Sequence, residues 1–242
     1  MRYLFIDTAH GAGAAWIDSE SEENLGVAET ADTRSQVEDL AGLVAKVVPE
    51  SETPDFVVVS RGPAPFTGLR VGLVSARTFG FAWGVPVFGL DELELLAAAG
   101  NNKLLSAERE QEWVIPCVDA RRHEVYAALF RRGSNGEPLR QGPDWVGASA
   151  ELPRMLTQWD ATFPNWSDSR VVAVGNAANQ LEGVSPLEVA LVDQAKAAGG
   201  LVVTLSGGDL ASLRGKTQTE LVVLGLGTEP EYLRRPDIQE KK

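Results

Sequence analysis

The sequence contains very few of the side chains that form disulfides and zinc sites. It has one cysteine, Cys117, and two histidines, His10 and His123, in 242 residues. A single cysteine cannot form an internal disulfide, and two histidines cannot supply a histidine-rich zinc site. The sequence therefore argues against a disulfide framework and against structural zinc.

Long hydrophobic runs are also absent. No stretch approaches the roughly 20 consecutive apolar residues that span a bilayer. The apolar run at the start of the chain is interrupted by Asp7, too early for the core of a signal peptide. We therefore expect a cytoplasmic protein with no membrane partner.

Basic side chains are in the minority. The chain has 22 Lys and Arg against 34 Asp and Glu, so its formal net charge is −12. A protein that binds nucleic acid alone needs a clustered basic surface, because its affinity comes from contacts with phosphates. The charge therefore argues against unaided nucleic-acid binding. The hydrophobic content of 44% is that of an ordinary globular protein.

The first half of the sequence predicts a strand meander followed by alternating helices and strands. Apolar runs at residues 3–6, 14–17 and 25–30 are separated by glycine and polar turns, a pattern typical of strands. Apolar residues at three- and four-residue spacings then predict a helix. These residues are Val37, Leu40, Leu43, Val44 and Val47.

Further along, a continuous apolar run at residues 56–59 predicts a strand that is buried on both faces. After it we expect a helix at 67–83, a strand at 86–90, a helix at 92–99 and a polar linker at 101–111. This alternation is typical of α/β layers.

The second half repeats the alternation. Strands are expected at residues 113–115, 125–130, 171–174 and 201–205, and helices at 150–159, 187–198 and 209–224. The sequence therefore predicts two similar α/β halves.

Residues 61–72 form the richest segment, because a buried strand leads into a Gly/Pro loop that opens a helix. Such a loop can present backbone N–H groups to a phosphate. However, Pro63 and Pro65 lack an N–H, and the spacing matches neither common phosphate-binding motif. The sequence therefore favours a structural role over phosphate binding.

The helix after this loop carries a stripe of small residues at four-residue spacing. The stripe consists of Gly68, Gly72, Ala76, Gly80 and Gly84. Small residues on one face let another backbone approach closely. The stripe has two interpretations: close packing on the chain's own sheet, or a helix–helix contact with a second subunit.

Asp7 lies at the end of the first expected strand, where open α/β proteins tend to bind ligands. A role with Mg²⁺ and a nucleotide is one interpretation, although aspartate is also a common turn residue. His123 lies between carboxylates in residues 119–126 and has the chemistry of a general base. A hairpin connection with solvated ion pairs explains this segment more simply.

Four segments resemble the TsaB family of tRNA threonylcarbamoyladenosine biosynthesis proteins. Residues 62–72, Gly-Pro-Ala-Pro-Phe-Thr-Gly-Leu-Arg-Val-Gly, resemble the family signature Gly-Pro-Gly-Ser-Phe-Thr-Gly-Leu-Arg-Ile-Gly. Residues 6–8, 119–126 and 230–234 match further family segments in the same order. The signature is specific, and the order of the other matches extends the resemblance over nearly the whole chain.

The resemblance implies an α/β actin-like ATPase (ASKHA) fold with two related subdomains, each a mixed sheet flanked by helices. We expect residues 1–103 to form the N-terminal subdomain with the dimerisation helices. Residues 104–242 are expected to form the C-terminal subdomain, with the last helix packing back on the N-terminal one.

For function, the resemblance implies a noncatalytic subunit for threonylcarbamoylation of adenosine 37 in tRNAs that read ANN codons. Its catalytic partner, TsaD, carries a metal-binding His-x-x-x-His motif that this sequence lacks. The resemblance also implies a homodimer when the chain is alone, pairing with TsaD, recruitment of the ATPase TsaE, and only indirect contact with tRNA. No cofactor is expected for this chain itself, and ATP is expected only in the complex.

For individual residues, we expect no catalytic and no metal-binding side chains. Asp7, Thr8 and Gly11 form the candidate nucleotide site. The expected partner interface consists of Val37, Leu40, Val44, Gly68, Leu69, Gly72, Leu73, Ala76 and Gly80. The sequence departs from the signature at Ala64 and Pro65, which argues against ligand binding in that loop.

An alternative function is an independent ATP-binding small-molecule kinase or ATPase of the same fold. This hypothesis depends on Asp7, Gly11 and the glycine pair Gly207-Gly208.

Overall fold

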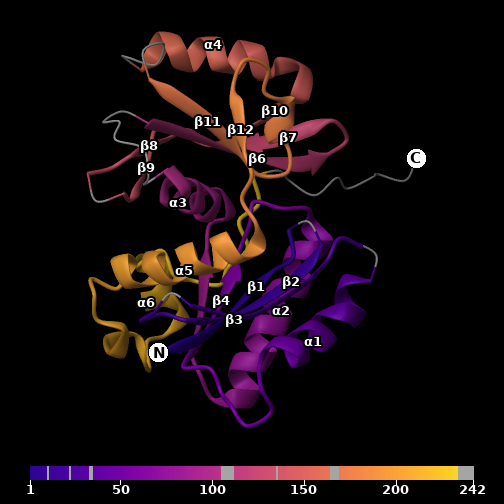
Figure 1. The fold of residues 1–242 in the computed structure, drawn as a ribbon, viewed down its shortest axis with the longest axis vertical. Coiled ribbons are helices and arrows are strands. Elements are labelled where there is room, and N and C mark those ends of the chain that lie inside the picture. The colour runs from indigo at the N-terminus through magenta and orange to yellow at the C-terminus, as the bar shows by residue number, and fades with distance from the viewer. Residues whose placement is uncertain are drawn as a thin grey trace.

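The computed structural model arranges the chain as two sheets with helices between and outside them (Figure 1). It describes residues 1–9, 11–21, 23–32, 35–104, 112–134, 136–163 and 169–233, apart from the side chains of residues 36, 37, 112 and 211. The two mixed sheets flanked by helices confirm the expected α/β, actin-like architecture. No helix in these ranges is long and apolar enough to cross a membrane.

The first sheet has five strands in the order β3-β2-β1-β4-β5. Its strands are β1 (Arg2–Asp7), β2 (Ala12–Asp18), β3 (Glu23–Thr30), β4 (Phe56–Ser60) and β5 (Val87–Leu90). The first three form the predicted antiparallel meander, and β4 and β5 run parallel to β1. Every residue of β4 is buried, which confirms the central strand that its continuous apolar run predicts.

The second sheet has seven strands, and the path β10-β7-β6-β11-β12 is extended by β8 and β9 next to β6. Its strands are β6 (Glu112–Arg121), β7 (Glu124–Ala127), β8 (Phe130–Arg132), β9 (Pro138–Arg140), β10 (Trp145–Ala148), β11 (Arg170–Val174) and β12 (Ser185–Leu187). Helix α4 (Leu152–Thr162) lies on its outer side (Figure 1). Short 3₁₀ helices occur at Ser149–Glu151, Ala178–Gln180 and Leu210–Leu213.

Helices cover both faces of the first sheet. Helices α1 (Gln36–Val47) and α2 (Phe66–Trp83) pack on one face (Figure 1). The other face is covered by α3 (Glu92–Leu104), α5 (Leu191–Leu205) and α6 (Gln218–Val223). We expected residues 104–242 to form the C-terminal subdomain, with the last helix packing back on the N-terminal one. Helix α6 does pack on the first sheet, and α5 also belongs to the core of that sheet.

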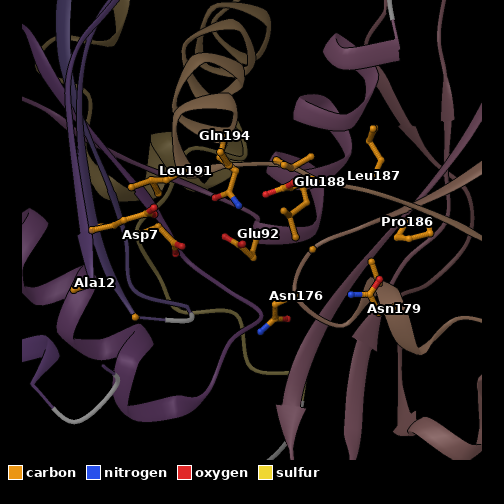
Figure 2. Close-up of a pocket in the computed structure, with 18 of the residues that line it drawn as sticks. Asp7, Ala12, Glu92, Asn176, Asn179, Pro186, Leu187, Glu188, Leu191 and Gln194 are labelled. Atoms are coloured by element: carbon orange, nitrogen blue, oxygen red, sulfur yellow. The ribbon is translucent and has the colours of Figure 1, made fainter. Parts of the chain in front are cut away.

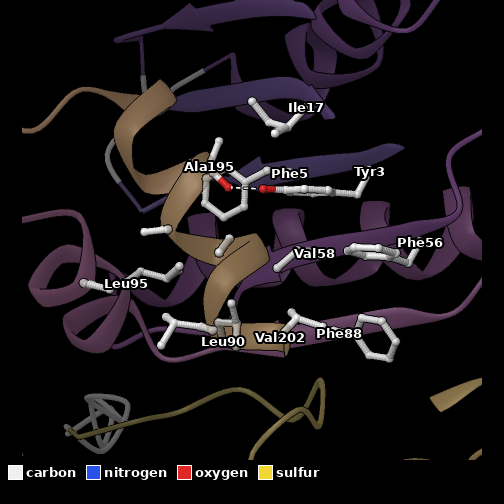
Figure 3. Close-up of a cluster of buried hydrophobic side chains, with 14 of the residues drawn as sticks. Tyr3, Phe5, Ile17, Phe56, Val58, Phe88, Leu90, Leu95, Ala195 and Val202 are labelled. Carbon is white, nitrogen blue, oxygen red and sulfur yellow. Dashed lines mark hydrogen bonds between the residues drawn. The ribbon is translucent and has the colours of Figure 1, made fainter. Parts of the chain in front are cut away.

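The first sheet and α5 are locked together around Tyr3, which is 1% exposed. Its hydroxyl donates a hydrogen bond of 2.6 Å to the Ala195 carbonyl, and its ring stacks on Phe56 at a centroid distance of 5.0 Å (Figure 3). A Cβ at Gly199 would lie 2.6 Å from the Tyr3 hydroxyl. Glycine at this position therefore lets the helix approach the ring.

Helix α3 is shared by the two sheets. Its Leu95 and Ala99 belong to the core of the first sheet, whereas Leu93 and Leu96 belong to a core with β6 and β11. Because one helix is buried on both sides, the two sheets form a connected structure.

Two of the predicted elements in the second half are wrong. The strand expected at residues 201–205 is the end of α5, because Leu201 and Val202 continue the buried face of that helix. The helix expected at 209–224 is a 3₁₀ turn followed by the short α6. The linker expected at 101–111 begins inside α3, and residues 105–111 lie outside the described part of the chain.

Residues 226–233, here called the C-terminal segment, run along β5 and α2. The Gly89 N–H donates a hydrogen bond of 3.0 Å to the Leu226 carbonyl. The Arg77 guanidinium donates to the Thr228 hydroxyl at 3.0 Å and to its carbonyl at 2.8 Å. The end of the described chain is therefore fixed to the first sheet and its helix.

The glycine stripe of α2 faces the chain's own sheet. Gly68, Gly72, Ala76 and Gly80 are buried, and a Cβ at Gly72 would collide with the Thr8 hydroxyl oxygen. This confirms the structural interpretation of the stripe. Gly84 differs, because it ends the helix in the left-handed conformation with a φ of 68°.

The expected partner interface needs the corresponding correction. Eight of its residues are buried within the chain, so they cannot present side chains to a second subunit. They are Leu40, Val44, Gly68, Leu69, Gly72, Leu73, Ala76 and Gly80. The ninth, Val37, lies in α1, and its side chain is outside the described part of the structure.

We therefore predict opposite effects for two helical glycine-to-alanine substitutions. Gly72→Ala should lower the free energy of unfolding by about 1–3 kcal/mol, because the new methyl group overpacks the contact with Thr8. Gly42→Ala should raise it by up to about 1 kcal/mol, because a Cβ there meets nothing within 4 Å and alanine favours the helix. Urea denaturation measures both values, and equal effects would contradict this packing.

Candidate functional site

A cleft lies between the two sheets, at the carboxyl ends of β1 and β11 (Figure 2). Its cavity has a volume of about 660 Å³, which is in the range of sites for small organic ligands. Open α/β sheets commonly bind ligands at this edge. The lining residues are Asp7, Gly11, Ala12, Gly13, Glu29, Thr30, Glu92, Leu96, Gly175, Asn176, Ala178, Asn179, Pro186, Leu187, Glu188, Val189, Ala190, Leu191 and Gln194.

Two carboxyl groups from different elements meet in this cleft. Asp7 ends β1, and its Oδ1 accepts a hydrogen bond of 2.9 Å from the Ala9 N–H. Glu92 begins α3 and is 0% exposed, and its Oε2 accepts a hydrogen bond of 2.6 Å from the Ser60 hydroxyl. Local turn geometry fixes Asp7, whereas strand β4 and helix α3 together fix Glu92.

Burial keeps these carboxyl groups from ionising at their usual pH. Desolvation raises the pKa of Asp7 to about 6, although the backbone hydrogen bonds from Ala9 and Thr8 oppose the shift. Desolvation, followed by the charge of Asp7, raises the pKa of Glu92 well above its usual value. Burial therefore favours the protonated form of both carboxyl groups more than in solvent-exposed side chains.

Two hydrogen-bond acceptors in the cleft have no partner in the described structure. They are Oε1 of Glu92 and Oε1 of Gln194, and both atoms are buried. Figure 2 shows the side chains of Asp7, Glu92 and Gln194 around the same part of the cavity. Buried acceptors of this kind are usually satisfied by a donor.

The charge of the cleft has one sign. Among the described residues, four that line it are acidic, namely Asp7, Glu29, Glu92 and Glu188, and none is lysine, arginine or histidine. Bare phosphate groups would be repelled there, because no cation among these described lining residues compensates their charge. The cleft therefore differs from a phosphate site built from basic side chains.

The structure places only part of the candidate nucleotide site in this cleft. Asp7 and Gly11 line it, whereas Thr8 does not. The Thr8 side chain is buried on the side of α2, where its hydroxyl donates a hydrogen bond of 2.8 Å to the Gly68 carbonyl. Thr8 therefore holds α2 against the sheet.

Sequence analysis missed Glu92 and Gln194. Glu92 comes two residues after β5, a parallel strand, so its position at a carboxyl end is a signal that could have found it. Gln194 had no such signal, because α5 reaches the cleft from the distant end of the sequence.

The Gly/Pro loop at residues 61–65 is covered by the C-terminal segment. The Glu231 N–H donates a hydrogen bond of 2.8 Å to the Arg61 carbonyl, and the two side chains form an ion pair of 3.0 Å. The Gly62 carbonyl accepts a hydrogen bond of 2.7 Å from the Glu92 N–H. These contacts support the structural role of the loop that its prolines indicate.

A second group of carboxylates links the two sheets. Oxygen atoms of Asp91, Asp144 and Glu231 lie within 4.8 Å of one another. Arg140 forms an ion pair of 2.8 Å with Asp91 and another with Asp144. Burial, with the nearby Asp91 next in importance, raises the pKa of Glu231 to about 7. Guanidinium groups already neutralise much of this cluster, so we assign it a structural role.

Residues 119–126 form the hairpin connection between β6 and β7, as the structural interpretation predicts. The backbone of Arg121, Arg122 and His123 has positive φ at this turn. The Asp119 N–H donates a hydrogen bond of 2.9 Å to Oδ1 of Asn176. Asn176 lines the cleft, so the hairpin is tied to the cleft wall.

Comparison with known proteins supports the resemblance seen in the sequence. A family model described as TsaD, tRNA N6-adenosine threonylcarbamoyltransferase, matches residues 23–140. The TsaB protein of Bacillus subtilis is 32% identical over 104 residues, covering 43% of this chain and 42% of that protein. The TsaB protein of Escherichia coli is 30% identical over 142 residues, which cover 56% of this chain and 58% of that protein.

The matches span only part of the curated relatives. An uncharacterized protein of Mycobacterium leprae is 37% identical over 137 residues, which cover 54% of this chain and 35% of that protein. Uncharacterized Mycobacterium tuberculosis proteins match over 59% of their length. The chain therefore spans about one third of the Mycobacterium leprae protein and about three fifths of the Mycobacterium tuberculosis proteins.

Solved structures share the whole fold. A Pseudomonas aeruginosa protein described as similar to the peptidase YeaZ superposes with a TM-score of 0.66 and 21% identity, covering 96% of this chain and 99% of that one. YeaZ from Pseudomonas aeruginosa superposes with a TM-score of 0.65 and 18% identity, and it covers the same shares of the two chains. The sequence matches and the shared fold support the resemblance of this chain to the TsaB family.

Proposed function

We propose that this chain is a noncatalytic subunit in the biosynthesis of threonylcarbamoyladenosine at position 37 of tRNAs that read ANN codons. The observation that carries this proposal is the sequence match to proteins named for that pathway, the TsaB proteins of Bacillus subtilis and Escherichia coli. The match of residues 23–140 to a TsaD family model is consistent with a common ancestry of this chain and the catalytic subunit.

The chemistry of the cleft supports a noncatalytic role. The described residues that line the cleft include no lysine, arginine, histidine or cysteine, so they supply neither a cation for a phosphate nor a strong nucleophile. Cys117 is buried, and burial raises the pKa of its thiol, so it stays protonated. The chain would therefore act on tRNA modification through a partner.

The outward sides of α1 and α2 are the surface that we propose for pairing with TsaD. These helices lie side by side on the first sheet (Figure 1). Phe81 is 90% exposed and Val74 is 62% exposed, although both side chains are strongly apolar. The outward helix face consists of these two residues and the small exposed residues Ala41, Gly42 and Ala45. It replaces the buried residues that sequence analysis assigned to the interface.

A polar rim borders this face. The Arg70 guanidinium lies 3.7 Å from the centre of the Phe66 ring and donates a hydrogen bond of 3.2 Å to the Tyr232 hydroxyl. Arg70 and Tyr232 are exposed next to the apolar residues of α2. An apolar centre with an arginine and a tyrosine at its edge is typical of a protein interface.

The remaining partners are proposals of the same kind. TsaE would join the complex with TsaD, and two copies of this chain would pair through the same face in the absence of TsaD. The net charge of −12 favours a tRNA contact that is made by the partners. Within this proposal, ATP would act in the complex, and the chain would work in the cytoplasm.

The alternative, an independent ATP-dependent kinase or ATPase, rests on the position of Asp7 and Gly11 in the cleft. The charged residues of the described lining are all acidic, which disfavours it. Titration calorimetry of the isolated chain with Mg-ATP separates the two functions, because micromolar binding with turnover would favour the enzyme.

The first prediction of this proposal concerns the tRNA itself. Deleting the gene should strongly reduce threonylcarbamoyladenosine in total tRNA, and a plasmid copy should restore it. Mass spectrometry of nuclease-digested tRNA measures the nucleoside. An unchanged level in the deletion strain would contradict the proposed function.

The second prediction concerns the outward helix face. Phe81→Asp should weaken pairing with TsaD at least about tenfold, because a buried unpaired carboxylate is costly at the centre of an interface. Val223→Asp is the matched control, since Val223 is 81% exposed but lies on α6, on the opposite face of the sheet. Co-purification and analytical ultracentrifugation measure the pairing. Equal behaviour of the two variants would place the interface elsewhere.

A further inference from the structure

The cleft between the sheets has acceptors that nothing in the described chain satisfies. Oε1 of Glu92 and Oε1 of Gln194 are buried without a hydrogen-bond partner. Glu92 is 0% exposed and Gln194 is 9% exposed, and both side chains line the cavity (Figure 2). An unsatisfied buried acceptor destabilises the fold, so such groups in a cleft point to a ligand that donates hydrogen bonds.

The charge of the cleft restricts the ligand further. Asp7, Glu29, Glu92 and Glu188 line the cavity, and no basic residue does in the part of the chain that the structure describes. A ligand that brings positive charge would satisfy the acceptors and also reduce the repulsion between the Asp7 and Glu92 carboxylates. The site therefore suits a cation.

The size and walls of the cavity favour an organic cation over a bare metal ion. A volume of about 660 Å³ is much larger than an ion needs, and apolar side chains form part of the wall. The apolar residues are Leu96, Leu187, Val189 and Leu191. Within the described residues, the carboxylates that converge closely enough for a metal are Asp91, Asp144 and Glu231, which lie outside this cleft.

We propose that the cleft binds a small aliphatic amine, with its ammonium group held between Glu92, Asp7 and Gln194 and its methylene chain against the apolar wall. The ammonium group of such an amine is protonated at neutral pH and donates three hydrogen bonds. This site is separate from the outward helix face, so it does not depend on the proposed pairing with TsaD.

Calorimetric titration of the full chain with putrescine tests this proposal. Putrescine should bind with a stoichiometry of one, whereas 1,4-butanediol, which has the same length without charge, should not bind. Glu92→Gln should weaken the binding at least about tenfold, because it removes a charge-assisted hydrogen bond. The control Glu182→Gln removes an equal charge from the exposed surface and should change the affinity less than about twofold.

Two further arms keep the result interpretable. Glu188→Gln changes an exposed residue at the edge of the cleft, so it leaves the buried pair intact and should weaken binding by about twofold to threefold. Raising the pH from about 5.5 to about 8 should strengthen putrescine binding, because Asp7, with a pKa of about 6, ionises in that interval. The other titratable lining groups are Glu29, Glu92 and Glu188.

Three results would overturn the proposal. Equal weakening by Glu92→Gln and Glu182→Gln would show that putrescine binds only to the acidic surface. Saturable binding of Mg²⁺ that excludes putrescine would identify a metal site instead. Absence of putrescine binding at millimolar concentration and about pH 8, with the chain folded by circular dichroism, would show that the cleft has no affinity for amines.

Discussion

The burial of α3 between the two sheets is the constraint on which the rest of the structure depends. Leu95 and Ala99 pack into the core of the first sheet, and Leu93 and Leu96 pack against the second. Removing either contact would expose a continuous apolar helix face to water. Because the helix begins directly after β5, the same packing brings Glu92 to the edge where the carboxyl ends of β1 and β11 meet.

Helix α5 completes this arrangement from the far end of the sequence. The hydrogen bond from Tyr3 to Ala195 and the close approach at Gly199 hold it against the first sheet. Its first turn brings Leu191 and Gln194 into the cleft. The cleft is therefore a consequence of how two helices pack on one sheet, while the opposite face of that sheet leaves the outward sides of α1 and α2 exposed to solvent.

Local patterns predicted the elements that are stabilised by near neighbours. The buried β4, the long α2 and the first meander follow from apolar runs and periodicity, and Asp7 was found because it ends a strand. The end of α5 was wrongly predicted as a strand at residues 201–205, whereas the helix continues through Gly199, which accommodates the Tyr3 ring. Gln194 and the C-terminal segment could not be predicted, since their contacts are long-range.

The stripe on α2 supports only one of the two interpretations that its pattern allowed. The four-residue spacing of small residues correctly indicated a close contact, and at Gly72 this contact is with the Thr8 side chain of the same chain, whereas exposed Phe81 and Val74 occupy the other side of the helix. Threonylcarbamoylation reconstituted from purified TsaD and TsaE with ATP, with and without this chain, tests the noncatalytic role most directly. Modified adenosine should form only when TsaD and this chain are both present. Equal activity of TsaD alone, or activity of this chain alone, would contradict that role.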